Sequence, residues 1–188
     1  SPSRGLGDVY KRQIVFPDPA EAAALTQAIN EAKTVALFVG AGVKNAREQV
    51  LALAEKIKAP IGHALGGKMY IQYDNPFDVG MSGLLGYGAA HEATHEADLL
   101  ILLGTDFPYN DFLPDANVAQ VDIDGTHIGR RTRIKYPVTG DVAATIENIL
   151  PHVDEKKDRS FLDKMLKKHY DKLEHVVEAY TSGVEKHT

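Results

Sequence analysis

Apolar residues in the first sixty positions form two helical patterns with a strand-like run between them. Four of them recur at the i, i+3, i+4, i+7 spacing of an amphipathic helix: Leu25, Ala28, Ile29 and Ala32. The run TVALFV at 34–39 is apolar almost throughout, as in a strand that is covered on both faces. A second helical set then follows: Val50, Leu53, Ala54 and Ile57. This alternation predicts a parallel sheet with right-handed crossover helices.

The same alternation continues towards the C-terminus. Further strands are predicted at PIGHAL (60–65), LLILLG (99–104), NVAQVDID (117–124) and YPVTGD (136–141), with a helix capped by Asp141 after the last. Residues 66–86 are interpreted as turn-rich. We therefore expect a three-layer α/β/α, Rossmann-like fold with five to six parallel strands.

Local signals mark the start of the first helix. Asp18 suits the N-cap, Pro19 suits the first helical position, and Glu21 is placed to reach back to the cap amide.

The chain is interpreted as three regions. Residues 1–13 show no apolar periodicity and are assigned to a non-native or disordered leader. Residues 14–152 are assigned to the α/β domain. Residues 153–188 form a charged linker and a helix from about 161 to 180, whose apolar face is expected to meet a missing neighbouring domain.

Composition narrows the classes of partner. The 188 residues contain no cysteine, which excludes disulfides and thiolate metal sites and fits a reducing compartment. The net charge is −5 without a basic block, so nucleic acid is not expected as a partner. The longest apolar runs are strand-sized, far short of the roughly 18 to 20 residues that cross a bilayer.

A glycine loop follows the first strand. Gly40, Ala41 and Gly42 form a Gly-x-Gly turn that would let a diphosphate approach the backbone and a helix N-terminus. The dinucleotide fingerprint fails, because Asn45 replaces its third glycine and His63 stands where an acid is expected. Any α/β domain needs a tight turn here, which is the alternative explanation of the glycines.

Two further loops carry candidate binding groups. The turn MSGLLG at 81–86 places two glycines around a leucine pair, and TDFPY at 105–109 offers hydroxyl, carboxylate and aromatic groups after a buried strand. In an open α/β sheet, ligands bind outside the carboxyl ends of the strands. These loops are therefore expected to line one trough.

Together these segments resemble the central domain of thiamine-diphosphate-dependent enzymes, of the DHS-like NAD/FAD-binding type, and most of all that of pyruvate oxidase and quinone-linked pyruvate dehydrogenase. The resemblance implies that FAD is the cofactor of this domain. Asp122, Ile123 and Asp141 are assigned to its adenosine end, and the alternative for Asp122 is a helix-cap or turn residue. The implied cofactor-binding residues are Gly40, Ala41, Gly42, His63, Leu65, Gly83, Leu84, Leu85, Gly86, Thr105, Asp106, Phe107, Pro108, Tyr109, Asp122, Ile123 and Asp141.

The resemblance also implies a cytoplasmic pyruvate oxidoreductase, a homotetramer in which this chain is one domain. Thiamine diphosphate and Mg²⁺ would bind in missing domains, and contact with a membrane quinone would involve missing segments. No catalytic residue is assigned, so the isolated chain is expected to be inactive on pyruvate. Three alternatives remain open: an acetolactate synthase with structural FAD, a decarboxylase whose middle domain binds ADP or nothing, and a nucleotide-binding module without catalysis.

One metal motif is set aside. His91, Glu92 and His95 match the H-E-x-x-H pattern of zinc proteases, but the helix gives way at once to a buried strand and no third ligand follows. No metal site is therefore assigned. The remaining histidines lie among polar neighbours and are interpreted as surface residues: His127, His152, His169, His175 and His187.

Overall fold

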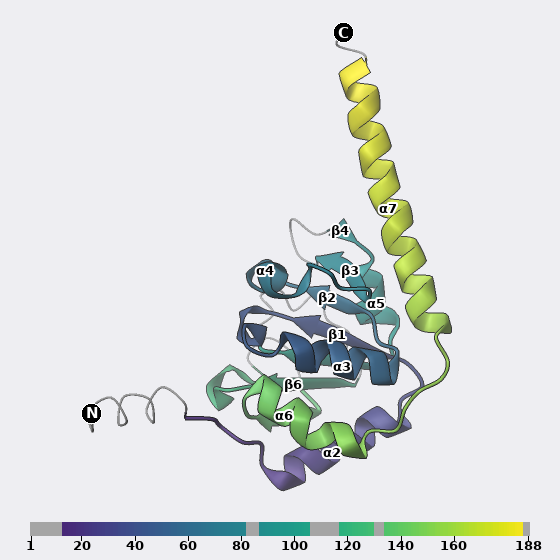
Figure 1. Ribbon diagram of the computed structural model, residues 1–188. Coiled ribbons are helices and arrows are strands. Elements are labelled where there is room, and N and C mark those ends of the chain that lie inside the picture. The colour runs from purple at the N-terminus through teal and green to yellow at the C-terminus, as the bar shows by residue number, and fades with distance from the viewer. Residues whose placement is uncertain (1–12, 82–86, 106–116, 130–133, 186–188) are drawn as a thin grey trace, which may run out of the picture.

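A mostly parallel β-sheet forms the middle layer of the chain, with helices on both of its faces (Figure 1). The computed structural model describes residues 13–81, 87–105, 117–129 and 134–185. Its elements in chain order are α2 (Pro19–Glu31), β1 (Val35–Val39), the 3-10 helix η1 (Ala41–Val43), α3 (Arg47–Ile57), β2 (Ile61–His63), η2 (Leu65–Gly67), α4 (Lys68–Ile71), β3 (Asp78–Met81), β4 (Tyr87–Gly88), α5 (Ala90–Glu96), β5 (Leu99–Leu103), β6 (Val118–Asp122), η4 (Gly125–His127), β7 (Tyr136–Thr139), α6 (Val142–Ile149), η5 (Leu150–His152) and α7 (Ser160–Glu185).

The order of strands places β1 near the middle of the sheet. Among the described residues the order is β4-β3-β2-β1-β5-β6-β7, and every neighbouring pair is parallel except β3 with β4. The chain moves outward from β1 through β2 and β3, then returns to place β5 on the other side of β1. This reversal creates a topological switch point between β1 and β5, where α/β proteins bind ligands. The predicted three-layer fold with five to six parallel strands is confirmed, and the described residues form six parallel strands.

Burial explains the apolar runs. Every residue of β1 and β5 is buried, because successive side chains point to opposite covered faces. Leu37 and Ile101 pack towards α2, α3 and α6, whereas Phe38 and Leu102 pack towards α5 and α7. In α3 the structure buries all four predicted positions, and in α2 it buries Leu25, Ala28 and Ile29 together with Ala22. Ala32, which was predicted for the α2 face, is the C-cap and is only partly buried.

One of the two side-chain contacts predicted for the start of α2 is observed. The Asp18 carboxylate accepts hydrogen bonds from the backbone N–H groups of Ala20 and Glu21. The Glu21 carboxylate accepts instead from the Thr139 backbone N–H at 3.3 Å, so the prediction that it returns to the cap is wrong. Packing of α2 beside β7 decides this partner.

Two local expectations are corrected. The region interpreted as turn-rich contains η2, α4 and β3, and β3 pairs with β2. The pairing also uses the Ile61 N–H, which donates to the Phe77 carbonyl at 2.8 Å. In addition, the glycine loop leads into the short η1, and α3 begins only at Arg47. Both features depend on contacts between distant segments, so local pattern does not reveal them.

Helix α7 is packed along its first half and exposed along its second. Leu162, Met165 and His169 are buried, and this half contacts β3, β4 and α5. The expectation that the apolar face of this helix meets a missing domain is wrong for these turns. Further along, the helix leaves the domain (Figure 1). An apolar stripe is exposed on this second half at Val176, Val177 and Tyr180, and Tyr170, next to His169, is exposed as well. None of the described helices is long and apolar enough to cross a membrane.

Candidate functional site

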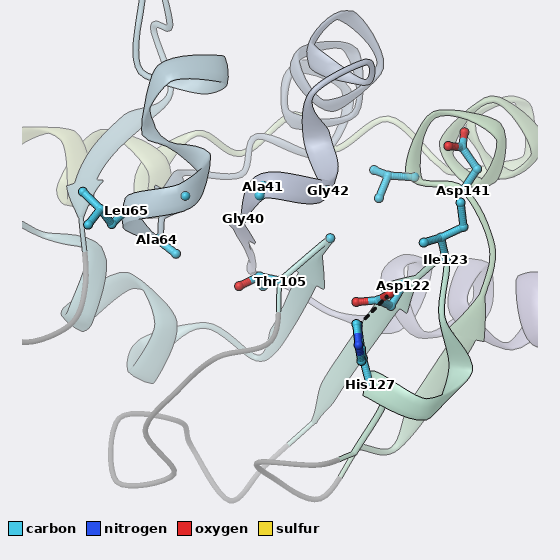
Figure 2. A pocket seen from close by; sticks show the side chains of 13 residues that line it. Gly40, Ala41, Gly42, Ala64, Leu65, Thr105, Asp122, Ile123, His127 and Asp141 are labelled. Carbon is cyan, nitrogen blue, oxygen red and sulfur yellow. Dashed lines mark ion pairs between the residues drawn. The ribbon is translucent and has the colours of Figure 1, made fainter. Parts of the chain in front are cut away.

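A cavity of about 580 Å³ lies at the carboxyl edge of the sheet, over the switch point (Figure 2). Segments that follow β1, β2, β5, β6 and β7 all contribute to it. Its lining residues are Gly40, Ala41, Gly42, Ala64, Leu65, Gly66, Gly104, Thr105, Asp122, Ile123, His127, Asp141 and Val142. This volume lies within the range of roughly 300 to 1,000 Å³ that is typical of small-molecule sites.

The loops after β1 and β5 touch through their backbones. The Gly42 N–H donates to the Gly104 carbonyl at 2.9 Å. A Cβ atom on Gly42 would lie 2.5 Å from the Gly104 Cα, and Gly104 itself has a φ of +60°. Close packing of two loops therefore requires these glycines, whether or not a ligand is bound. The result is a cavity wall made of backbone and small side chains.

Asp122 lies at the end of β6 and is 6% exposed. Its Oδ1 accepts a hydrogen bond from the Asp124 backbone N–H at 2.9 Å, which is a turn-forming contact across two residues. The turn role considered for Asp122 is therefore confirmed. The same carboxylate lines the cavity, so the turn role and a ligand role are compatible.

Asp141 is the N-cap of α6. Its Oδ2 accepts from the Ala144 backbone N–H at 2.9 Å, as the predicted cap requires. Asp141 and Asp122 both line the cavity on its β6–β7 side (Figure 2). No lysine or arginine occurs among the described lining residues.

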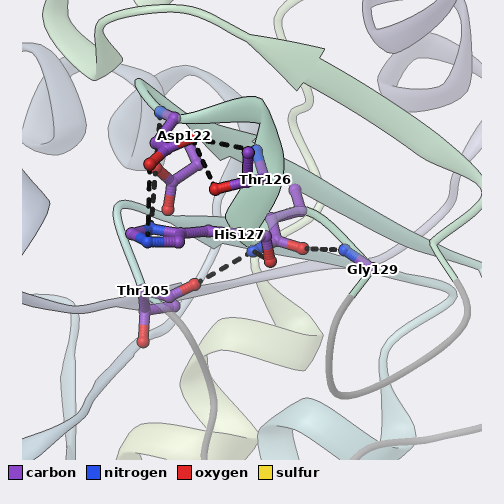
Figure 3. A network of polar contacts seen from close by, with 7 residues as sticks. Thr105, Asp122, Thr126, His127 and Gly129 are labelled. Carbon is purple, nitrogen blue, oxygen red and sulfur yellow. Dashed lines mark hydrogen bonds and ion pairs between the residues drawn. The ribbon is translucent and has the colours of Figure 1, made fainter.

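His127 is a lining residue that the sequence analysis assigned to the surface. Its Nδ1 lies 3.6 Å from Asp122 Oδ1, and its Nε2 lies 3.6 Å from Asp124 Oδ2. Figure 3 shows the imidazole beside Asp122, in the turn that follows β6. The sequence feature that could have identified His127 is its position, five residues beyond the end of β6, which carries the candidate carboxylate Asp122.

Other lining residues were also missed. Ala64, Gly66, Gly104 and Val142 flank predicted positions and lack polar side chains, so residue chemistry alone does not identify them. They contribute shape to the cavity.

His63 is not among the lining residues. Its side chain is fully buried, with Nδ1 3.3 Å from Asp78 Oδ1 on the neighbouring strand β3. The assignment of its side chain to the cavity is corrected, because Ala64 and Leu65, just beyond β2, reach the cavity instead. The predicted sites Gly83–Gly86 and Asp106–Tyr109 lie outside the described residues.

The prediction that His169 lies at the surface is wrong, because only 3% of this residue is exposed. Its Nε2 lies 3.9 Å from Asp78 Oδ2, where α7 meets β3. Burial, the largest influence, and the nearby His63 lower the pKa of His169, and Asp78 opposes this effect.

The H-E-x-x-H residues are engaged within the protein. Glu92 forms an ion pair with Lys172 of α7, and His95 Nδ1 contacts the His91 carbonyl at 2.8 Å. Within the described part of the chain, no group of three or more histidine, cysteine or acidic side chains is arranged to hold a metal ion.

Comparison with known proteins agrees with this architecture. The family described as "Thiamine pyrophosphate enzyme, central domain" matches residues 22–149. A 42.6 kDa uncharacterised protein from the isoamylase 3' region of Pseudomonas amyloderamosa is 44% identical over 172 residues, which are 91% of this chain and 43% of that protein. The acetolactate synthase isozyme 1 large subunit of Escherichia coli is 33% identical over 132 residues, covering 67% of this chain and 24% of that protein.

A solved structure shows the same fold. The protein, from Mycobacterium smegmatis and described as a thiamin diphosphate-dependent enzyme, has a TM-score of 0.66 and 25% identity, covering 78% of this chain and 30% of its own. The present chain therefore spans less than half the length of each of these relatives. Because the family match extends over more than half of its residues, the chain belongs to the thiamine pyrophosphate enzymes and corresponds to their central domain.

Proposed function

We propose that this chain is the nucleotide-binding middle domain of a longer thiamine-diphosphate-dependent enzyme of the acetolactate synthase kind. Similarity to an acetolactate synthase over two thirds of the chain favours this reading over a pyruvate oxidoreductase. Thiamine diphosphate would bind in other domains of the parent enzyme. The cavity would bind the adenosine diphosphate part of FAD, held for structural reasons, or ADP itself.

One observation carries the proposal: five strand exits meet in a single cavity with two carboxylates on one side. Carboxylates accept hydrogen bonds from ribose hydroxyls and from the adenine amine, and they are the groups that Asp122 and Asp141 supply. The lining at Gly40, Ala41 and Gly42 carries no bulky side chain, so a diphosphate could lie against the backbone there. The lining residues therefore fit an adenine nucleotide.

The apolar stripe on the second half of α7 fits a middle domain. The side chains of Val177 and Tyr180 are 65% and 76% exposed, an arrangement that another domain of the parent enzyme would cover. The linker and helix would thus connect the nucleotide domain to its neighbour.

Nucleotide titration tests the proposal. We expect the purified chain to bind ADP and FAD by calorimetry, and to retain flavin absorbance after desalting if FAD is its ligand. Asp122→Asn should weaken binding by about tenfold or more, because it removes the charge from a hydrogen-bonding group. Asparagine can still accept the Asp124 N–H, so the turn is retained.

Asp163→Asn, on the exposed surface of α7, is the matched control and should bind like the unmodified chain. Failure of the unmodified chain to bind either nucleotide would contradict the proposal, as would equal binding by the Asp122 variant. Retention of ADP without FAD would favour the decarboxylase alternative.

A second candidate remains the FAD domain of a pyruvate oxidoreductase. Two sequence segments support it: the loop TDFPY at 105–109 and the run DNPFDVGM at 74–81. The two candidates differ in whether a bound flavin is reduced during turnover. Flavin bleaching in the full parent enzyme with pyruvate and no electron acceptor would favour this candidate.

A further inference from the structure

His127 is a polar residue of the cavity to which the proposed function gives no role. It ends η4, and its side chain is 41% exposed at the cavity. Both ring nitrogens face carboxylates at 3.6 Å, which is longer than a hydrogen bond. The imidazole therefore lies between two carboxylates at the edge of the cavity.

The charges around the cavity create a problem for an anionic ligand. Asp122 and Asp141 line the described part of the cavity, and Asp124 lies beside it. A diphosphate would approach these carboxylates without meeting a lysine or arginine among the described lining residues. His127 is the described lining side chain that can carry a positive charge.

A buried amide holds the turn that carries His127. Gln120 is 3% exposed, and its Nε2 donates to the Thr105 carbonyl at 3.2 Å and to the His127 carbonyl at 3.5 Å. Its Oε1 accepts from the Gly129 N–H at 3.1 Å. One side chain thus ties the end of β5 to both sides of the turn after β6 (Figure 3). These contacts hold the backbone of the turn that carries His127.

We propose that His127 is the anion-facing residue of the cavity and makes it selective for nucleotides that carry a diphosphate over neutral nucleosides. The inference rests on the proposed nucleotide site and adds a residue that sets its ligand class. The imidazole lies between the carboxylates of Asp122 and Asp124 and donates a hydrogen bond to a phosphate oxygen. The carboxylates remain partners for the uncharged ribose and adenine groups.

Paired titrations with ADP and adenosine test this role. His127→Gln should weaken ADP binding by about tenfold, the effect of one charge-assisted hydrogen bond. Adenosine binding should change by less than about twofold, because the diphosphate is absent. His127→Lys supplies a cationic donor at this position and should recover most of the ADP affinity.

His152→Gln provides the matched control, because His152 is exposed and lines a different groove beside α2. It should leave both affinities unchanged. Equal ADP binding by His127→Gln and the unmodified chain would overturn the inference. Equal weakening of ADP and adenosine would also overturn it, since that result indicates a structural role.

The two proposals fail in distinguishable ways. If the unmodified chain binds neither ADP nor adenosine, the nucleotide site itself is wrong and the role of His127 falls with it. If the unmodified chain binds ADP and the His127 variants bind it equally well, only the role of His127 is wrong. Thermal unfolding of each variant would show that the fold is retained.

Discussion

Gly42 and Gly104 show how a residue chosen for packing also shapes a binding site. Their loops leave two adjacent parallel strands, and the backbones approach so closely that neither position has room for a side chain. The glycine motif was first a candidate for ligand contact. The structure gives it a second reason, which holds in the absence of any cofactor.

At this scale we expect Gly42→Ala to destabilise the chain by about 1 to 3 kcal/mol. Its Cβ would lie 2.5 Å from the Gly104 Cα, and relief requires a backbone shift. Gly183→Ala is the control, because a Cβ there meets nothing within 4 Å and alanine favours a helix by about 0.5 to 1 kcal/mol. Urea denaturation measures both changes. A neutral Gly42→Ala variant would show that the two loops are not in tight contact.

Among the elements, α7 combines two environments in one helix. Its first turns cover the edge of the sheet formed by β3 and β4, whereas the later turns expose valine and tyrosine side chains. The sequence pattern is apolar along both parts, so periodicity alone predicts one continuous buried face. Tertiary contact decides where burial stops, and His169 lies at that point.

Acid should weaken the attachment of α7. Burial lowers the pKa of His169 below its usual 6.5, with His63 adding to the effect and Asp78 opposing it. The folded chain therefore binds this proton less readily than the unfolded chain. The contribution to stability is complete above pH 6.5 or so and is lost as the pH falls through the lowered folded pKa.

The corresponding measurement is the free energy of unfolding at a series of pH values from 7 to 5. His169→Gln should flatten the decline on the acid side, because glutamine does not titrate. His175→Gln, whose side chain is 82% exposed in the unmodified chain, should leave the slope as it is. An unchanged slope in the His169 variant would exclude this histidine as the source.

For the whole molecule, stability should depend on the first half of α7 but not on the second. Truncation after residue 173 removes mainly exposed turns and should shift the melting temperature by only a few degrees. Truncation after residue 159 also removes Leu162 and Met165, both fully buried. Losses of roughly 2 to 5 kcal/mol for each such side chain approach the total stability of a domain.

Circular dichroism during heating distinguishes these outcomes. The shorter chain should lose its cooperative transition, and the longer one should keep it. A cooperative transition near the original temperature after the shorter truncation would mean that the sheet does not need α7.

Much of the architecture could be predicted from apolar spacing. The buried runs of β1 and β5 and the four-residue faces of α2 and α3 are local patterns, and they already require a doubly covered parallel sheet. The short β3 could not be predicted, because its pairing with β2 is a long-range contact and its sequence contains glycine. Candidate site residues at strand ends could be predicted because the carboxyl ends of parallel strands share one edge.

The sequence by itself determined the class of fold and the edge of the sheet that carries polar groups, and the family resemblance implied the two carboxylates of the cavity. Only the tertiary structure decided that His127 faces that cavity and that His63 and His169 are buried beside Asp78. The physical reason is that backbone periodicity is encoded locally, whereas the surroundings of a single imidazole depend on which distant strands and helices pack around it.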